Sequence, residues 1–123
     1  MSKILIMDDE REFVDMLALR LTKTGGYDVI KAFDGEEGLK SVQDNNPDLI
    51  LLDIMMPKLD GYEVINRLKA DEATKNIPVI ILSASTSPST LKKFRKIGVI
   101  DFIIKPFEAP DLMEKIKKCL TKS

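Results

Sequence analysis

The fold of this chain is indicated by one stretch, which reads Leu49-Ile50-Leu51-Leu52-Asp53-Ile54-Met55-Met56-Pro57-Lys58-Leu59-Asp60-Gly61. Four consecutive aliphatic residues before an aspartate are typical of a parallel strand that is buried on both faces. Pro57 has no backbone N–H and Asp60-Gly61 is a turn dipeptide, so the strand must end close to Asp53. Because ligands bind at the carboxyl ends of strands in open α/β sheets, Asp53 is a candidate functional residue. The alternative is an ordinary solvated aspartate in a turn.

Apolar runs of the same kind occur along the whole chain and alternate with helical patterns. Strands are predicted at 3–7, 27–33, 49–53, 79–82 and 100–104, and each is followed by apolar residues at helical spacing. The second strand has the weakest pattern and is expected at or near an edge. Such alternation predicts an α/β fold, a doubly wound parallel sheet of five strands with helices on both faces. The flavodoxin-like strand order 2-1-3-4-5 belongs to this class.

Length and composition indicate one globular domain spanning residues 1–123. The chain has 123 residues, of which 44% are hydrophobic and 32% charged, a balance typical of soluble globular proteins. The amino terminus does not resemble a secretory signal and no apolar run is long enough to cross a membrane, so a cytoplasmic protein without membrane contact is expected. The single cysteine, Cys119, occupies a core-facing position of the last predicted helix, which favours a packed thiol. Without histidine, Ser-His-Asp catalysis and histidine metal sites are excluded.

Polar residues follow four of the five predicted strands. Asp8 and Asp9 follow the first, Asp53 ends the third, Ser83 follows the fourth and Lys105 follows the fifth. Since the carboxyl ends of parallel strands share one edge, and strands one and three are neighbours in the 2-1-3-4-5 order, three carboxylates are expected to meet there. That much like charge would raise the pKa of at least one acid, so the cluster predicts a hard divalent cation, of which Mg²⁺ fits best.

The chemistry of this cluster favours phosphoryl transfer over nucleotide binding. The chain has no GxxxxGK[ST] or GxGxxG loop, and the acids after the first strand repel bare phosphate. A carboxylate beside a metal ion can attack an activated phosphoryl group and form an aspartyl phosphate. In that reaction Asp53 is the acceptor, Lys105 supplies a cation and the Ser83 hydroxyl donates a hydrogen bond.

Four short motifs occur together in the chain. They are Asp8-Asp9 after the first strand, Asp53-Ile54-Met55-Met56-Pro57 with Asp60-Gly61, Ser83-Ala84, and Lys105-Pro106-Phe107. With this set the chain resembles, over essentially its whole length, the receiver domain of two-component response regulators, a CheY-like signalling module. Each motif alone has low specificity, and their joint occurrence carries the resemblance.

The resemblance implies a role for each residue of the cluster. Asp53 would accept a phosphoryl group from the phosphohistidine of a histidine kinase or a histidine phosphotransfer protein. Mg²⁺ would be held by Asp9, Asp53 and the backbone carbonyl of Met55, with Asp8 assisting through water. Ser83 and Lys105 would contact the phosphoryl group. Such a protein catalyses its own phosphotransfer and a slow autodephosphorylation, and is not a conventional turnover enzyme.

The resemblance also implies a conformational switch. The Ser83 hydroxyl would be coupled to Phe102 on the fifth strand, which lacks the hydroxyl of the more usual tyrosine, and the bond before Pro106 is expected to be cis. Phosphorylation would change the surface of the fourth helix, fifth strand and fifth helix, and so control a downstream protein partner or effector domain. A phosphorylation-dependent homodimer is one arrangement that this surface allows. Met55 and Ser85 carry no carboxylate or amide that could orient an attacking water, which predicts slow hydrolysis.

Basic side chains are numerous in the fourth and fifth predicted helices: Lys92, Lys93, Arg95, Lys96, Lys115, Lys117, Lys118 and Lys122. They are either ordinary solvated helix faces or a docking surface for an acidic partner. Direct nucleic-acid binding is disfavoured because the net charge is −1. Two further hypotheses are a phosphorylation-independent interaction module with the same fold and a metal-dependent phosphohydrolase. The phosphohydrolase hypothesis requires a second acid two residues after Asp53, and the chain has Met55 at that position.

Overall fold

The computed structural model describes residues 2–56, 59–84, 87–99 and 101–121. Its strands are β1 (Lys3–Met7), β2 (Asp28–Ala32), β3 (Leu49–Asp53), β4 (Val79–Ser83) and β5 (Asp101–Ile104). Its helices are α1 (Arg11–Gly25), α2 (Gly35–Asn45), α3 (Gly61–Ala70), α4 (Pro88–Lys96) and α5 (Ala109–Thr121). β4 extends to Ser83 instead of ending at residue 82, and β2 lies just inside its predicted range. Ile100, where the fifth strand was predicted to start, lies outside the described residues.

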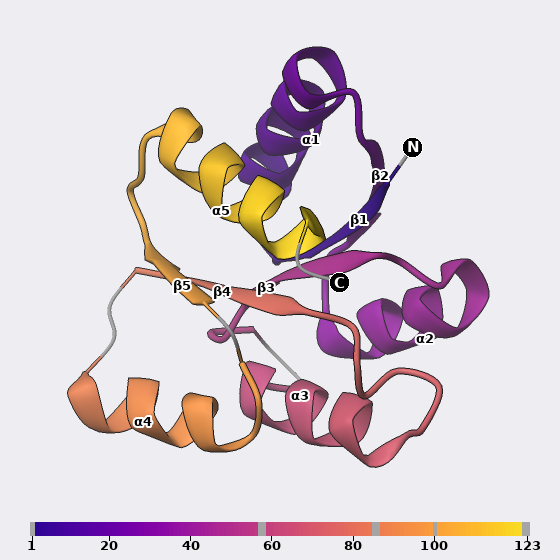
Figure 1. The fold of residues 1–123 in the computed structure, drawn as a ribbon, viewed down its shortest axis with the longest axis vertical. Coiled ribbons are helices and arrows are strands. Elements are labelled where there is room, and N and C mark those ends of the chain that lie inside the picture. The colour runs from indigo at the N-terminus through magenta and orange to yellow at the C-terminus, as the bar shows by residue number, and fades with distance from the viewer. Residues whose placement is uncertain (1, 57–58, 85–86, 100, 122–123) are drawn as a thin grey trace.

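The strands form one parallel sheet in the order β2-β1-β3-β4-β5 (Figure 1). This confirms the flavodoxin-like fold and the edge position of the second strand. β3 lies at the centre of the sheet, and every residue of Leu49–Asp53 is buried. A strand in this position needs apolar side chains on both faces, which is why its sequence is a continuous aliphatic run.

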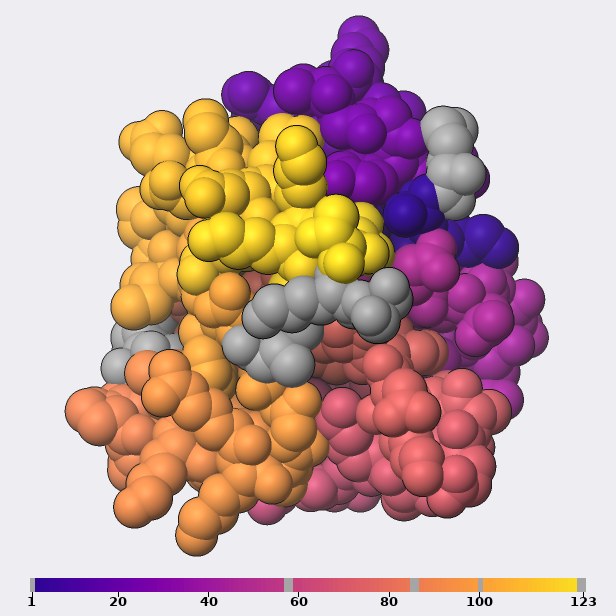
Figure 2. All heavy atoms as spheres, in the orientation of Figure 1, coloured from indigo at the N-terminus to yellow at the C-terminus, as the bar shows by residue number. Residues whose placement is uncertain are grey.

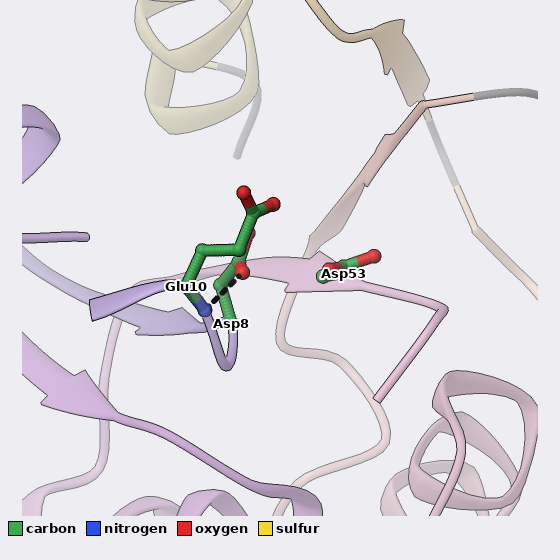
Figure 3. A group of neighbouring side chains, drawn as sticks. All are labelled: Asp8, Glu10 and Asp53. Atoms are coloured by element: carbon green, nitrogen blue, oxygen red, sulfur yellow. Dashed lines mark hydrogen bonds between the residues drawn. The ribbon is translucent and has the colours of Figure 1, made fainter. Parts of the chain in front are cut away.

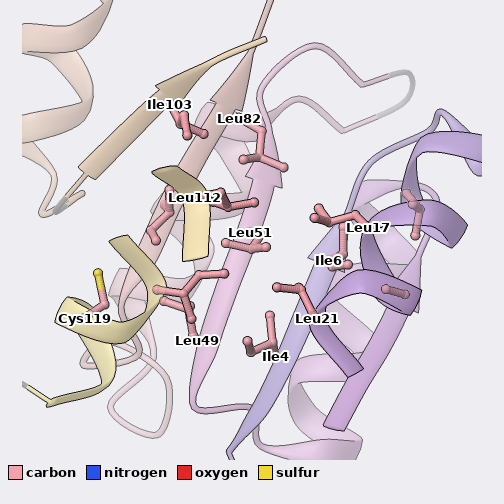
Figure 4. Packing of buried hydrophobic residues seen from close by; sticks show 14 residues of the cluster. Ile4, Ile6, Leu17, Leu21, Leu49, Leu51, Leu82, Ile103, Leu112 and Cys119 are labelled. Carbon is pink, nitrogen blue, oxygen red and sulfur yellow. The ribbon is translucent and has the colours of Figure 1, made fainter. Parts of the chain in front are cut away.

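Helices cover both faces of the sheet. One core lies between the sheet and helices α1 and α5 (Figures 1 and 4), and a second core lies between the sheet and helices α2, α3 and α4. Successive residues of β1 alternate between the two: Ile4 and Ile6 face α1 and α5, whereas Leu5 and Met7 face the other layer. Each fully buried aliphatic side chain contributes about 1.5–3 kcal/mol, so the two cores hold the strand ends in place. Cys119 is buried in the first core, as predicted.

Helix α4 has fewer buried residues than α3 or α5 in the described part of the chain. It begins as predicted, with Ser87 as the N-cap that accepts a hydrogen bond from the Thr90 N–H and with Pro88 in the first turn. Phe94 is its one buried residue among those described. The Lys93 ammonium also lies 3.8 Å from the centre of the Tyr62 ring on α3. Together with β5 and α5, this helix forms one flank of the molecule, coloured orange to yellow in Figure 2.

No described helix has the length and apolar character that a membrane span requires.

Candidate functional site

Four polar side chains lie at the carboxyl edge of the sheet because the strands that carry them are parallel and in register. Asp8 follows β1, Asp53 ends β3, Ser83 ends β4 and Lys105 follows β5. Asp8 is fully buried and Asp53 is 5% exposed. Ser83 is also buried, and its backbone carbonyl accepts a hydrogen bond from the Lys105 N–H at 2.6 Å. The sheet therefore places two acids, a hydroxyl and a cation at one edge.

The Lys105 ammonium is surrounded by carboxylates. Its Nζ lies 2.6 Å from Asp8 Oδ2, 3.0 Å from Glu10 Oε1 and 3.6 Å from Asp53 Oδ2. It also lies 4.3 Å from the centre of the Phe13 ring, and the side chain is only 13% exposed. Burial acts to lower the pKa of Lys105, but the hydrogen bonds to Asp8 and Glu10 and the negative charges of Asp8 and Asp53 together outweigh it, and the pKa is raised. The cation is therefore retained at physiological pH.

Each of the two buried aspartates is oriented by the backbone that follows it. Asp8 Oδ1 accepts a hydrogen bond from the Glu10 N–H, and Asp53 Oδ1 accepts one from the Met55 N–H, both at 3.0 Å. This contact with the residue two positions on is the usual local bond of an aspartate at a turn. In both residues it leaves Oδ2 as the oxygen nearer to Lys105.

The carboxyl group of Asp53 is a weaker acid than an ordinary aspartate. Burial raises the pKa of Asp53 from 3.8 to about 6, helped by the negative charges of Asp8 and Asp9, while the Met55 N–H and Lys105 act in the opposite direction. The sequence predicted that like charge would raise the pKa of at least one acid of the cluster, but for Asp53 burial is the larger cause. Asp53 is nevertheless mostly ionised at neutral pH.

This acidity predicts that Asp53→Asn stabilises the metal-free protein. The pKa of Asp53 is about 6 in the folded chain against 3.8 for the free side chain. As pH rises from 4 to 6, the unfolded chain loses this proton first and the folded wild type loses stability. Asparagine avoids the penalty, so we expect a gain of about 2 kcal/mol near pH 7 that disappears near pH 4.

Urea unfolding in the presence of a chelator at several pH values measures this gain. Asp44→Asn, at an exposed position of α2, is the matched control and should show no such pH dependence. A gain for Asp53→Asn that is equal at pH 4 and pH 7 would show that the buried charge is not its cause.

The site also contains a group of oxygen ligands. Asp8, Glu10 and Asp53 each offer a carboxylate oxygen, and these three atoms lie within 4.8 Å of one another. In Figure 3 the Asp8 and Glu10 side chains lie together and Asp53 lies beside them at the end of β3. A donor set made only of oxygens suits a hard divalent cation. The acidic cluster therefore fits a metal site.

The cluster differs from the predicted ligand set in one member. Glu10 was not predicted as a site residue; its signal was its place as the third acid directly after the first strand. Asp9, which was predicted, is exposed and lines a cavity of about 560 Å³ together with Met55 and Asp60. Asp9 still lies close enough to raise the pKa of Asp53.

The loop after Asp53 returns close to the strand that carries it. The Gly61 N–H donates to the Ile54 carbonyl at 3.3 Å, and a Cβ at Gly61 would lie 2.6 Å from Ile54 Cα. Glycine is therefore required where α3 begins. Asp60 caps this helix by accepting a hydrogen bond from the Glu63 N–H. Met55 is 73% exposed beside the site.

The remaining predicted residues lie on or after β5 or outside the described part. Phe102 is half-buried on β5, with the guanidinium of Arg95 from α4 at 5.5 Å from its ring centre. The Lys105–Pro106 peptide bond is cis, as expected. Pro57 and Ser85, which the sequence placed beside the site, lie outside the described residues.

Comparison with known families agrees with this geometry. The family model described as "Response regulator receiver domain" matches residues 4–117. The alkaline phosphatase synthesis transcriptional regulatory protein PhoP of Bacillus subtilis is 39% identical over 121 residues, which are 98% of this chain and 49% of PhoP. The hybrid signal transduction histidine kinase D of Dictyostelium discoideum is 35% identical over 96% of this chain, but only 8% of the kinase is covered. The chain thus spans half or less of these two relatives.

A solved structure shows the same fold at nearly full length. The chemotaxis protein CheY4 of Vibrio cholerae superposes with a TM-score of 0.92 and 29% sequence identity, covering 98% of this chain and 99% of CheY4.

Proposed function

The chain belongs to the response regulator receiver domain family, and on that basis we propose that residues 1–123 are a single phosphorylation-controlled switch of two-component signalling, with Asp53 as the phosphoryl acceptor. The observation that supports this most is the buried, mostly ionised Asp53 with a lysine ammonium 3.6 Å from its Oδ2. A nucleophile needs an adjacent positive charge when the group that it attacks is itself anionic. The donor would be a phosphohistidine on a histidine kinase or a histidine phosphotransfer protein.

The proposed reaction exchanges one bond to phosphorus for another. A carboxylate oxygen of Asp53 attacks phosphorus, a P–O bond forms, and the P–N bond to the donor imidazole breaks with its electron pair going to the nitrogen. The Met55 N–H holds Asp53 Oδ1, which leaves Oδ2 towards Lys105. Lys105 and the Ser83 hydroxyl would then contact the transferred phosphoryl oxygens.

A divalent cation fits the same oxygen donors. We assign Mg²⁺ to Asp9, Asp53 and the Met55 carbonyl, with Asp8 acting through water, on the basis of the family resemblance and the acidic cluster at this edge. When bound, it neutralises negative charge on the phosphoryl oxygens. The protein's part is to hold these oxygens in place, through the N–H contacts of Asp8 and Asp53 and the burial of both side chains.

The proposed output surface is the flank formed by α4, β5 and α5 (Figure 2). Phe102 would be the switch residue there, coupled to Ser83. Some basic side chains of this flank already have partners, since Lys115 pairs with Asp101 at 3.0 Å and Lys93 lies on Tyr62. Lys92, Lys96 and Lys117 are exposed and form no ion pair with another described residue, so they are among the side chains available to an acidic protein partner. Lys122 lies outside the described residues.

The downstream partner would be a separate protein, an attached effector domain or a second phosphorylated copy of the chain. No direct contact with nucleic acid or membrane is part of the proposal, and a cytoplasmic location is proposed for it.

Binding of beryllofluoride, which mimics a phosphoryl group on an aspartate, should change the amide chemical shifts of Phe102 and of α4 and α5 in the presence of Mg²⁺. Such changes are expected because a ligand that binds one of two states more tightly shifts the population towards it. Two-dimensional NMR measures them, and Asp53→Ala with the same additions should show none. Shift changes confined to the carboxyl edge of the sheet would contradict the proposed switch and leave the acceptor role intact.

The exposed Met55 predicts a long-lived phosphoryl group. Its thioether cannot orient an attacking water, whereas an amide can, so we expect Met55→Asn to hydrolyse its phosphoryl group roughly ten-fold faster than wild type, less than the roughly 100-fold or more of a general base. Loss of ³²P from the purified phosphoprotein measures the rate. Met16→Asn is the control, since Met16 on α1 is 74% exposed and lies outside the site. Faster hydrolysis by wild type than by Met55→Asn would refute the role of this side chain.

A further inference from the structure

Glu10 occupies a helix-capping position that it does not use for capping. It is the N-cap residue of α1, with φ −84° and ψ 91°, but its side chain forms no capping hydrogen bond. At the starts of α2 and α3 the N-cap is an aspartate, Asp34 or Asp60, whose carboxylate accepts a backbone N–H of the first turn. The Glu10 carboxylate instead accepts a hydrogen bond from Lys105 Nζ at 3.0 Å.

This contact matters because the Lys105 ammonium has three hydrogens to donate. Asp8 and Glu10 accept two of them at 2.6 and 3.0 Å, whereas Asp53 Oδ2, at 3.6 Å, lies beyond hydrogen-bond distance. The ammonium is thus held closer to the two acids after β1 than to the proposed acceptor. A phosphoryl group on Asp53 can use the third hydrogen only if the ammonium moves towards it, and the bonds to Asp8 and Glu10 oppose that movement.

The two competing acids differ in how easily they release the lysine. Asp8 is fully buried, so losing its cation would leave a buried charge without compensation. The Glu10 side chain is 63% exposed and water can replace the lysine at little cost. A cavity of about 420 Å³, lined by Phe13 and Phe107 among others, adjoins both Glu10 and Lys105. Of the two hydrogen bonds that the Lys105 ammonium donates, the one to Glu10 is therefore the easier to break.

We propose that Glu10 is a positioning residue that holds the Lys105 ammonium away from Asp53 in the resting protein and so weakens the affinity of the site for a phosphoryl group. This rests on the proposed acceptor role of Asp53. It assigns the Glu10 carboxylate to the lysine and not to the metal ion, although its oxygen lies within 4.8 Å of the two aspartate oxygens.

Three variants separate the contact from the charge. Glu10→Gln removes the charge of the side chain. Glu10→Asp keeps the charge, but its side chain is too short to reach Lys105 from the same backbone position. Glu12→Gln is the control, because it removes an equal charge at an exposed position in the first turn of α1. The probe is beryllofluoride at saturating Mg²⁺, titrated by two-dimensional NMR. We expect Glu10→Gln and Glu10→Asp each to bind it about three- to ten-fold more tightly, and Glu12→Gln to match wild type.

Every other pattern overturns the proposal. If Glu10→Asp matches wild type while Glu10→Gln binds more tightly, the effect comes from repulsion between the charge of residue 10 and beryllofluoride. The contact between Glu10 and Lys105 then plays no part. If Glu10→Gln binds beryllofluoride no more tightly than wild type, Glu10 does not restrain Lys105, whatever the result for Glu10→Asp. Calorimetric titration with Mg²⁺ alone gives an independent readout, in which a ten-fold or larger loss for Glu10→Gln would make Glu10 a metal ligand.

Failure of the proposed function has a different signature. In that case beryllofluoride leaves the wild-type spectrum unchanged, as it does that of Asp53→Ala. A response of wild type equal to that of all three variants instead retains the acceptor role of Asp53 and removes only the role of Glu10.

Discussion

Asp53→Ala is expected to abolish covalent phosphorylation of the chain, with incorporation at least about 100-fold below wild type, because the nucleophile itself is removed. Wild type incubated with a small-molecule acyl phosphate and Mg²⁺ should gain one phosphoryl group by intact-protein mass spectrometry. That group should be lost on treatment with hydroxylamine, which cleaves acyl phosphates. Borohydride reduction followed by peptide mapping should place the modification at residue 53.

The control for this result must be an acid that the chain can spare. Asp44→Ala, at an exposed position of α2, should be phosphorylated at the wild-type rate. Phosphorylation of Asp53→Ala at the rate of wild type would assign the acceptor to another residue and remove the basis of the proposed function. If wild type gains no phosphoryl group and its affinity for partner proteins is unchanged by the treatment, the phosphorylation-independent interaction module is favoured instead.

Lys105→Met is expected to lower the free energy of unfolding by about 3 kcal/mol near pH 7, because it leaves buried carboxylates without their cation. Asp8 is fully buried and accepts a 2.6 Å hydrogen bond from this ammonium, and Asp53 Oδ2 lies 3.6 Å from it. Methionine keeps an apolar side chain of similar length, so the loss reports the charge, including its contact with the Phe13 ring at 4.3 Å, and not a cavity. Chemical denaturation in the presence of a chelator measures the difference.

Two further conditions identify the cause of this loss. The pKa of Asp53 is already raised to about 6, and protonation of Asp53 removes its buried charge, so the deficit of Lys105→Met should shrink as pH falls towards 4. Added Mg²⁺ should also reduce it, since a divalent cation replaces the missing positive charge. Lys115→Met is the control: its partner Asp101 is partly exposed, and the expected cost is below about 1 kcal/mol. Equal losses for the two lysines at all pH values would mean that the buried charges are not what Lys105 stabilises.

Much of the site could be predicted because each of its residues directly follows or ends a strong strand signal. The aliphatic run before Asp53 defined β3, and the same logic placed Asp8, Ser83 and Lys105 at the ends of their strands. A parallel sheet brings such ends to one edge whatever the details of packing. Position in the sequence was therefore sufficient to bring these four residues together.

Glu10 could not be found in this way. Its importance depends on the direction of its side chain at the start of α1. That side chain does not cap the helix and instead reaches Lys105 across the edge of the sheet. Residue 10 and residue 105 are far apart along the chain, and no local pattern links them. A raised pKa was predicted for at least one acid of the cluster, but burial, the main cause of the raised pKa of Asp53, depends on atoms supplied by the whole fold.

The sequence by itself determined the order of strands and helices, the two apolar faces of the sheet and the identity of the residues at its carboxyl edge. These follow from short-range periodicity and from the general rule that parallel strands end together. Only the tertiary structure decided which carboxylates share Lys105, how deeply Asp53 is buried and which exposed acid restrains the cation. Those quantities depend on distances of a few ångströms between segments from opposite ends of the chain, and electrostatic energies change steeply over such distances.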